Sequence, residues 1–295
     1  MKRIILSIPL LLALFACLPS PAAAVCITDD TGEEVCLEAP PARAISTYGA
    51  FTETIWELGG GETLVARTKN DTTIPEVAGL PSVGTGLRPN IEYLLALKPD
   101  LVIARASKAG AETLSSLRER GIKTAAFDPA SVADIYSLIE RLGKLFGLEE
   151  RGVELMEEIK GEIAAVETMV AKRERTPSLI YEVRAEPLTV AGHASLVAEL
   201  VKIAGGELVV DVDKKLVRFD LEKLLAINPD LYVVQEGPMN LKPLPPKERA
   251  HHPALKAVRE GRVLTVDEKL ISRPGPRVGE AVEVLARFIH PELWQ

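Results

Sequence analysis

The chain has 295 residues, of which 47% are hydrophobic, 4% aromatic and 26% charged, and its formal net charge is −7. This length suits two modest domains better than one. The acidic balance argues against nucleic acid or an anionic membrane surface as the partner. It leaves the charge inside any cleft undetermined.

The first 24 residues are typical of a secretory signal. Residues 1–3 are positively charged, residues 4–18 are almost entirely apolar, and three alanines at 22–24 provide a cleavage site. The apolar run is too short to span a bilayer comfortably, and no later segment is long enough. We therefore expect an exported, periplasmic protein that is cleaved after Ala24. The alternative is a lipoprotein that is anchored through Cys17.

Two further cysteines follow the signal and flank a turn. Cys26 and Cys36 enclose the sequence ITDDTGEEV, which has turn formers in its middle and alternating strand residues on both sides. The pattern predicts a β-hairpin whose cysteines face each other. In an oxidising compartment they would form a disulfide. Two reduced thiols are the alternative, and two lone cysteines are a poor metal site.

Strands and helices alternate through the first half of the mature chain. Gly59-Gly60-Gly61 ends one helix, and Asn90 caps another that stops at Pro99-Asp100. Alternation of this kind predicts a parallel sheet that is covered on both faces. The predicted strands are 43–46, 63–67, 101–104 and 123–127, and the predicted helices are 50–58, 90–98, 109–120 and 132–145.

One long helical pattern separates the two halves. Residues 148–173 would span roughly 35–40 Å at 1.5 Å per residue, which is enough to connect two domains. The second half then repeats the first, with strands at 178–183, 231–235 and 262–266 and helices at 195–204, 220–227 and 279–289. We expect an α/β fold of two Rossmann-like lobes with mainly parallel sheets, 25–147 and 176–295, joined by a backbone helix in 148–175.

The repetition is visible in the sequence itself. NIEYLLALKPDLVIA occupies residues 90–104, and DLEKLLAINPDLYVV occupies residues 220–234. Each stretch places a glutamate in the first turn of a helix and a Pro-Asp pair before a buried strand. They are equivalent elements of two similar lobes.

Five stretches in order resemble the helical-backbone class of periplasmic substrate-binding proteins. They are CITDDTGEEVCLEAPPARAIS, FTETIWELGGGETLVART, LPSVGTGLRPNIEYLLALKPDLVIA, LTVAGHASLVAELVKIAGGE and HPALKAVREGRVLTVDEKLISRPGPR. The resemblance covers essentially the whole mature chain. It implies a protein that delivers an iron–siderophore complex, haem or cobalamin to an ABC importer, and it implies no catalytic residue and no cofactor.

The resemblance also assigns a role to the twin glutamates. In the family, a surface glutamate on each lobe pairs with arginines on the two copies of the inner-membrane permease, and the matching positions are Glu92 and Glu222. A two-fold symmetric permease with its cytoplasmic ATPase needs two like anchors on one monomeric binding protein. The alternative is that both are ordinary first-turn residues favoured by the helix dipole.

Cationic residues recur where a cleft should lie. Ligand-facing loops of open α/β sheets follow the carboxyl ends of the strands. Guanidinium groups bind carboxylate, catecholate and phosphate oxygens, so these positions favour an anionic metal chelate such as a ferric siderophore. We expect only some of them to touch the ligand. The candidates are Arg67, Arg88, Arg105, Lys108, Arg184, Arg218, Arg273 and Arg277.

Haem and cobalamin remain alternative ligands. Haem iron needs an axial ligand, and Tyr48 and His193 lie on loops that should face each other. Cobalamin would prefer aromatic walls, for which Tyr48, Tyr181 and Phe219 are candidates. Trp56 is a further aromatic residue, but it falls on an apolar helical face and is better explained as core.

No enzyme motif emerges from the sequence. We find no nucleophile elbow, phosphate-binding glycine loop or zinc-protease helix. His251 and His252 are neighbours and would point in opposite directions, so a direct metal site there is not expected. A metal-chelatase on a similar two-lobed fold is the alternative from a different functional class. Turnover of a chelate would distinguish it from a binder.

Overall fold

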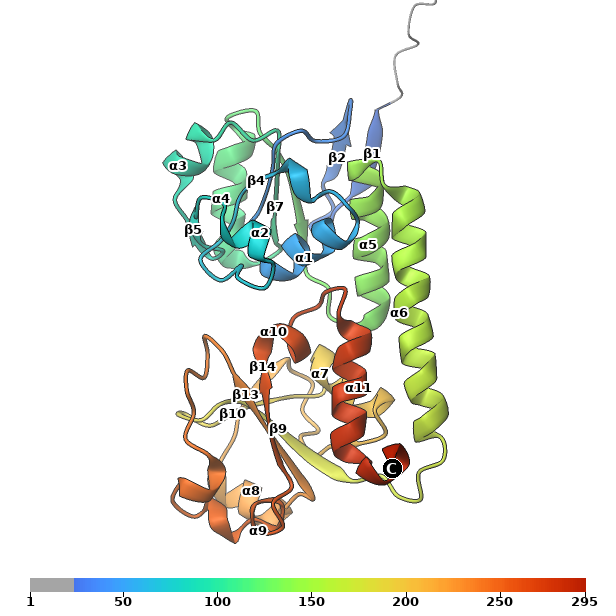
Figure 1. Ribbon diagram of the computed structural model, residues 1–295. Helices are drawn as coiled ribbons and strands as arrows, with labels where there is room; N and C mark the ends of the chain where they lie inside the picture. The colour runs from blue at the N-terminus through green and yellow to red at the C-terminus, as the bar shows by residue number, and fades with distance from the viewer. Residues whose placement is uncertain (1–23) are drawn as a thin grey trace, which may run out of the picture.

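The computed structural model describes residues 24–295 and shows two α/β lobes beside a long helix (Figure 1). The body of the predicted signal, including Cys17, lies outside the described residues. Within the described part, no helix has both the length and the apolar character needed to cross a membrane. The two-lobed α/β fold expected from the sequence is confirmed.

The N-terminal lobe contains a four-stranded parallel sheet in the order β4-β3-β7-β8. Its strands are β3 (Ala44–Ser46), β4 (Leu64–Ala66), β7 (Leu101–Arg105) and β8 (Lys123–Phe127). Its helices are α1 (Gly49–Glu57), α2 (Pro75–Ala78), α3 (Ile91–Ala96), α4 (Lys108–Arg118) and α5 (Val132–Phe146), with a short 3-10 turn at Gly61–Thr63. Asn90 caps α3 as predicted, because its side chain accepts from the Tyr93 N–H. A short hairpin, β5 (Gly84–Thr85) and β6 (Arg88–Pro89), was not expected.

The C-terminal lobe has a six-stranded mixed sheet. Three longer strands, β9 (Ser178–Arg184), β13 (Leu231–Glu236) and β14 (Val263–Asp267), run parallel, and β11 (Glu207–Leu208) pairs parallel to β9. The antiparallel edge formed by β10 (Thr189–Ala191) and β12 (Leu216–Arg218) was not predicted. The strand–helix alternation that reveals β3 and β4 does not mark β10 or β12, because no helix separates β9 from β10 or β11 from β12. The helices are α7 (Leu196–Ile203), α8 (Leu221–Ile227), α9 (Lys256–Arg259), α10 (Glu268–Ile271) and α11 (Val278–Ile289), with 3-10 turns at Pro246–Glu248, His252–Ala254 and Pro291–Trp294.

The connecting helix α6 (Glu149–Val170) lies within the segment that the sequence assigned to it. Its 22 residues correspond to roughly 33 Å. Figure 1 shows α6 running alongside α5 of one lobe and α11 of the other, and both contacts are extensive. The helix buries one stripe at helical spacing, and this stripe belongs to a core shared by both lobes. Its members are Leu155, Ile159, Ile163, Val166 and Val170.

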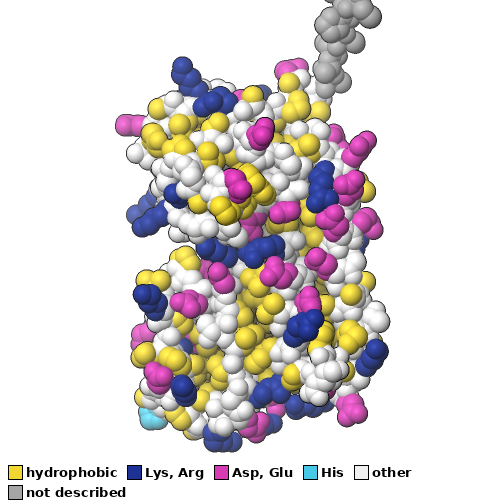
Figure 2. Space-filling view, in the orientation of Figure 1, with side chains coloured by type: hydrophobic (Ala, Val, Ile, Leu, Met, Phe, Trp, Pro, Cys, Tyr) yellow, Lys and Arg dark blue, Asp and Glu magenta, His cyan; other side chains and the backbone are white. Residues whose placement is uncertain are grey.

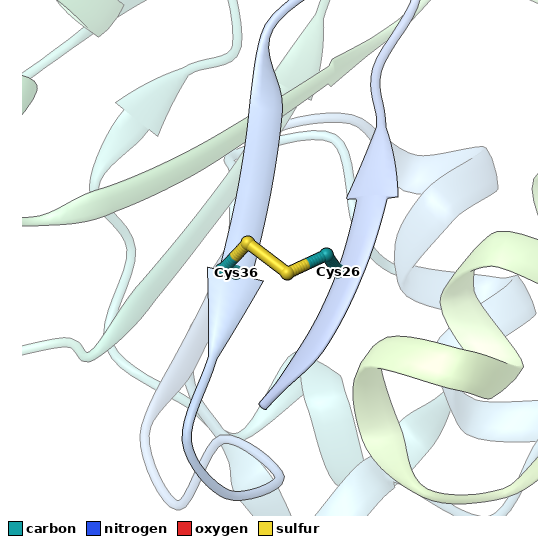
Figure 3. Close-up of a disulfide and its surroundings, with 2 residues drawn as sticks. All are labelled: Cys26 and Cys36. Carbon is teal, nitrogen blue, oxygen red and sulfur yellow. A yellow bond between two sulfur atoms is a disulfide. The ribbon is translucent and has the colours of Figure 1, made fainter. Parts of the chain in front are cut away.

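The N-terminal hairpin consists of β1 (Val25–Thr28) and β2 (Glu34–Leu37). Cys26 pairs directly with Cys36 in its register, and the two sulfurs are bonded at 2.04 Å (Figure 3). The predicted disulfide is therefore confirmed. The inner face of the hairpin packs into the large core through Ile27, Val35 and Leu37.

The repeated Pro-Asp pairs perform the same task in each lobe. The Asp100 carboxylate accepts from the backbone N–H groups of Ala42 and Arg43, at 2.8 to 3.1 Å, just before β3. The Asp230 carboxylate accepts from the backbone N–H and the hydroxyl of Ser178 at 3.0 and 2.9 Å, at the start of β9. Each carboxylate thus fixes where the neighbouring strand of its sheet begins.

Candidate functional site: the cleft between the lobes

A cleft lies between the lobes, where the carboxyl ends of the strands of both sheets meet. It comprises two adjoining hollows of about 240 and 330 Å³ that share Tyr48, Arg105, Met239 and Glu268 in their walls. Figure 2 shows a waist between the lobes, where Lys and Arg side chains lie beside Asp and Glu side chains. Most of the smaller hollow is lined by the C-terminal lobe, and most of the larger hollow by the N-terminal lobe.

Three charged residues from the two lobes meet at one edge of the cleft. Arg105 ends β7, and its Nε and Nη2 both lie 3.0 Å from Asp128 Oδ1, just after β8. Lys215 comes from the other lobe, immediately before β12, and its Nζ lies 2.8 Å from Asp128 Oδ2. One carboxylate therefore bridges a cation of each lobe. Arg105 and Lys215 also line the smaller hollow.

A second arginine enters the cleft from the C-terminal lobe. Arg273 is only 7% exposed, and its Nε lies 3.4 Å from Glu268 Oε1. It packs against Gly49, the first residue of α1, where a Cβ atom would lie 2.6 Å from Arg273 Nη1 and 2.7 Å from Asp71 Oδ1. Burial raises the pKa of Asp71, against hydrogen bonds from Thr68 and the charge of Arg273.

Tyr48 stands at the centre of the cleft, at the N-cap of α1. Its ring packs edge-on against Phe51, with centroids 5.0 Å apart, and the Arg105 guanidinium lies 5.4 Å from its centroid. Burial raises the pKa of the Tyr48 hydroxyl; Arg105 and Arg273 oppose the rise, and Glu268 adds to it. Within residues 24–295 this hydroxyl makes no side-chain hydrogen bond, although it lines both hollows.

Large apolar side chains surround these charges and remain open to solvent. Leu87 is 61% exposed, Leu216 45% and Met239 37%, and all three line the cleft. Exposed apolar groups that cluster around a hollow are typical of a ligand-binding surface. The deeper wall of the smaller hollow is also apolar and consists of Val183, Ala191, Leu196 and Val197.

The structure brings together three of the residues that we predicted to contact ligand. Tyr48, Arg105 and Arg273 line the cleft. Two other predicted residues have structural roles. The Arg67 guanidinium donates hydrogen bonds to the backbone carbonyls of Thr68, Ala78 and Leu80. Tyr181 is fully buried, and its hydroxyl lies 3.0 Å from Ser272 Oγ, so it supports the wall from behind.

The remaining predicted residues lie outside the two hollows as the structure describes them. Arg88, His193 and Arg218 are exposed, and Arg184 is half-buried at the end of β9. Lys108 is exposed at the start of α4, and Arg277 Nε lies 3.3 Å from Glu53 Oε2 across the lobe interface. The histidine expected to face Tyr48 is therefore not part of the cleft wall. Trp56 and Phe219 both pack against core clusters.

Sequence reasoning missed several residues of the wall. Glu268 follows β14 directly and Gln235 lies one residue before the end of β13, so the strand-end rule that found the arginines also applies to them. Lys215 gave no comparable signal, because it precedes a three-residue strand that the sequence did not predict.

Comparison with known proteins identifies the family. A family model described as periplasmic binding protein matches residues 45–270. The chain belongs to this family. Its two lobes on a long helix agree with that membership, and the resemblance seen in the sequence is confirmed.

Individual relatives of this periplasmic binding protein span nearly the same length. It is 28% identical over 277 residues to the uncharacterized ABC transporter substrate-binding lipoprotein YvrC of Bacillus subtilis (strain 168), covering 92% of this chain and 87% of that protein. It is 26% identical over 255 residues to the vitamin B12-binding protein of Photorhabdus laumondii, covering 86% and 90%. The structure of the periplasmic heme-binding protein RhuT from Roseiflexus sp. RS-1 in apo form matches with a TM-score of 0.76 and 26% identity, covering 86% of this chain and 99% of that one.

The twin glutamates lie away from the cleft. Glu92 is exposed in the first turn of α3, and Glu222 is exposed in the first turn of α8. In Figure 1, α3 and α8 belong to opposite lobes and both lie on the side away from α6. Neither glutamate lines the two hollows.

Proposed function

We propose that this periplasmic binding protein captures an anionic metal chelate, foremost a ferric siderophore, and delivers it to the permease of an ABC importer. The observation that carries the proposal is the placement of cations. Arg105 from one lobe and Lys215 and Arg273 from the other line a single cleft, although the chain has a net charge of −7. Charge-assisted hydrogen bonds from both lobes would hold an anion and would favour the approach of one lobe to the other.

The apolar rim supports the same class of ligand. A chelate combines a charged metal centre with an organic frame, and Leu87, Leu216 and Met239 can cover that frame. Export to the periplasm, and assembly with a permease dimer and its ATPase, are part of the proposal. The names of the relatives support a substrate-binding role.

Optical titration tests the proposal. The purified mature chain is titrated with a ferric tris-catecholate, a ferric tris-hydroxamate, haemin and cyanocobalamin, while tryptophan emission and visible absorption are followed. We expect saturable, one-to-one binding of the anionic ferric catecholate in preference to the neutral hydroxamate. Preference for the neutral chelate, or binding of none, would refute an anionic ferric chelate as the ligand. Recovery of each chelate unchanged distinguishes a binder from a chelatase.

Haem is a second candidate, and Tyr48 favours it. Tyr48 lines the cleft, its phenol oxygen has no side-chain partner in the described chain, and an arginine lies beside its ring, so this residue is suited to be an axial ligand of ferric iron. If haem is the ligand, Tyr48→Phe should remove the phenolate-to-iron absorption and weaken haemin binding at least tenfold. If a siderophore is the ligand, the same change should leave its affinity within about threefold, because only one hydroxyl is lost.

A further inference from the structure

The bridge between Arg105, Asp128 and Lys215 lies where the proposed ligand should place negative charge. Both cations line the smaller hollow, and the residues after Asp128, Pro129 and Ala130, line it too. The Asp128 carboxylate contacts Arg105 through one oxygen and Lys215 through the other, at 3.0 and 2.8 Å. A carboxylate or catecholate of a ligand would approach the same two cations.

The position of Asp128 is fixed from behind by the disulfide-bonded hairpin. The Asp128 backbone N–H donates to Asp30 Oδ2 at 2.7 Å, and Asp30 Oδ1 lies 2.6 Å from Arg141 Nη1 of α5. In the same turn, Asp29 Oδ2 accepts from the Ala126 N–H of β8 at 3.0 Å. The hairpin turn therefore braces the end of β8 and holds Asp128 beside Arg105 and Lys215.

The bridge is weak enough to be exchanged. The side chains of Arg105, Asp128 and Lys215 are 41%, 33% and 44% exposed. Ion pairs this open to water contribute little each, because solvent screens them and ordering two long side chains costs entropy. A ligand that carries several negative charges can displace one carboxylate from such a pair.

We propose that Asp128 is a specificity-determining placeholder that bridges the lobes in the ligand-free protein and is displaced by an anionic group of the ligand. The inference rests on the proposed function. An interaction that is present before binding and lost on binding weakens binding by its own free energy. Asp128 therefore selects against singly charged solutes, because one anionic group would interact with Arg105 and Lys215 no more strongly than the Asp128 carboxylate does. Multiply charged chelates replace it and gain further contacts.

The binding test compares Asp128→Asn with Asp213→Asn, which makes the same charge change in the loop that carries Lys215. Asp213 is exposed and forms no ion pair within residues 24–295. Asp128→Asn should tighten binding of a ferric tris-catecholate by about three- to tenfold, since no bridge is broken and repulsion is removed. Binding of a neutral ferric tris-hydroxamate should stay within about twofold, and Asp213→Asn should change neither. Unchanged or weaker catecholate binding by Asp128→Asn would overturn the placeholder role.

A second measurement needs no ligand. Spin labels on two exposed positions, 119 in the N-terminal lobe and 223 in the C-terminal lobe, report the interlobe distance. Asp128→Asn should broaden the distribution and shift it to longer distances, and Asp213→Asn should not. Identical distributions for wild type and Asp128→Asn would refute the bridge. If the wild type binds neither chelate, the chelate proposal and the placeholder role are both refuted. The spin-label distances then test only whether Asp128 bridges the lobes.

Discussion

Gly49 lies at the start of α1 in the N-terminal lobe, against Arg273 of the C-terminal lobe. A side chain there would approach Arg273 Nη1 to 2.6 Å and Asp71 Oδ1 to 2.7 Å. Both neighbours are more than nine-tenths buried, so neither can swing freely away. The absence of a side chain at this position therefore allows the arginine of one lobe to reach the helix of the other.

Replacing Gly49 by alanine should disturb that contact. We expect Gly49→Ala to lower the free energy of unfolding by about 1–3 kcal/mol, the usual cost of overpacking. It should also weaken ferric catecholate binding, because Arg273 is displaced. Urea unfolding and chelate titration measure the two effects. If stability and affinity were both unchanged, the close packing of Arg273 on α1 would be contradicted.

Asp230 illustrates a residue whose charge state supports the fold. The Lys256 ammonium, 2.5 Å away, and the hydrogen bonds from Ser178 lower the pKa of Asp230 to about 2. Since the folded pKa lies below the unfolded value near 3.8, its contribution is present above about pH 4 and is lost as the pH falls toward 2.

We expect Asp230→Asn to destabilise the protein by about 1 kcal/mol at neutral pH, after allowing for solvent screening of the pair. The difference between variant and wild type should shrink between about pH 4 and pH 2, as the wild-type carboxylate becomes protonated. Urea unfolding at a series of pH values provides the measurement. A difference that stays constant with pH would show that the charge of Asp230 contributes nothing.

The sequence could predict cleft residues at the ends of long parallel strands, but it could not predict those in other loops. Arg105 follows a buried parallel strand, so its place in the cleft could be predicted. Arg67 also follows a strand, but its guanidinium donates to the backbone carbonyls of Thr68, Ala78 and Leu80 and is not directed at the cleft. Lys215 precedes a short antiparallel strand, and pairing between distant segments leaves no local pattern.

At the scale of elements, α6 joins the two lobes and packs against α5 of one and α11 of the other. Gly161 lies on the exposed face of α6, and a Cβ atom there would meet nothing within 4 Å. Gly279 lies at the start of α11, where a Cβ atom would come 2.0 Å from Glu162 Oε2. The first glycine only lowers helix propensity, whereas the second allows two helices to pack.

These two glycines should respond in opposite directions. Gly161→Ala should raise the free energy of unfolding by about 0.5–1 kcal/mol, because alanine restricts the unfolded chain and favours the helix. Gly279→Ala should lower it, since the new Cβ would also lie 2.7 Å from Glu162 Cβ, and α6 and α11 would have to shift apart. Denaturant unfolding of the two variants makes the comparison. Stabilisation by Gly279→Ala would mean that this helix contact is looser than described.

At the scale of the whole molecule, each lobe carries one copy of a repeated helix, whereas the two lobes contribute different residues to the cleft. The helices α3 and α8 have similar sequences, belong to opposite lobes (Figure 1), and carry Glu92 and Glu222 in their first turns. The cleft is unsymmetrical, because Arg105 ends a parallel strand, Lys215 precedes an antiparallel strand and Arg273 follows the short helix α10. This division suits a protein that binds an unsymmetrical ligand and docks on a symmetrical permease.

Removing both glutamates should separate docking from ligand binding. Glu92→Ala with Glu222→Ala should leave chelate affinity within about twofold, because neither residue lines the cleft. Transport and capture by permease vesicles should fall in each single variant and most in the double variant, as expected for a two-point attachment. The matched control is Glu157→Ala with Glu283→Ala on α6 and α11. Normal docking by the first double variant would refute the role of the repeat.

Calorimetric titration of a ferric tris-catecholate into wild type, Arg273→Glu and Arg175→Glu tests most directly whether the cleft binds an anionic chelate. Arg175 is exposed beyond the end of α6 and provides the same charge reversal far from the cleft. The wild type and Arg175→Glu should bind one equivalent with similar affinity. Arg273→Glu should bind at least about thirtyfold more weakly, because a charge-assisted bond becomes a repulsion. Equal affinity of all three proteins would contradict an anionic ligand held between the lobes.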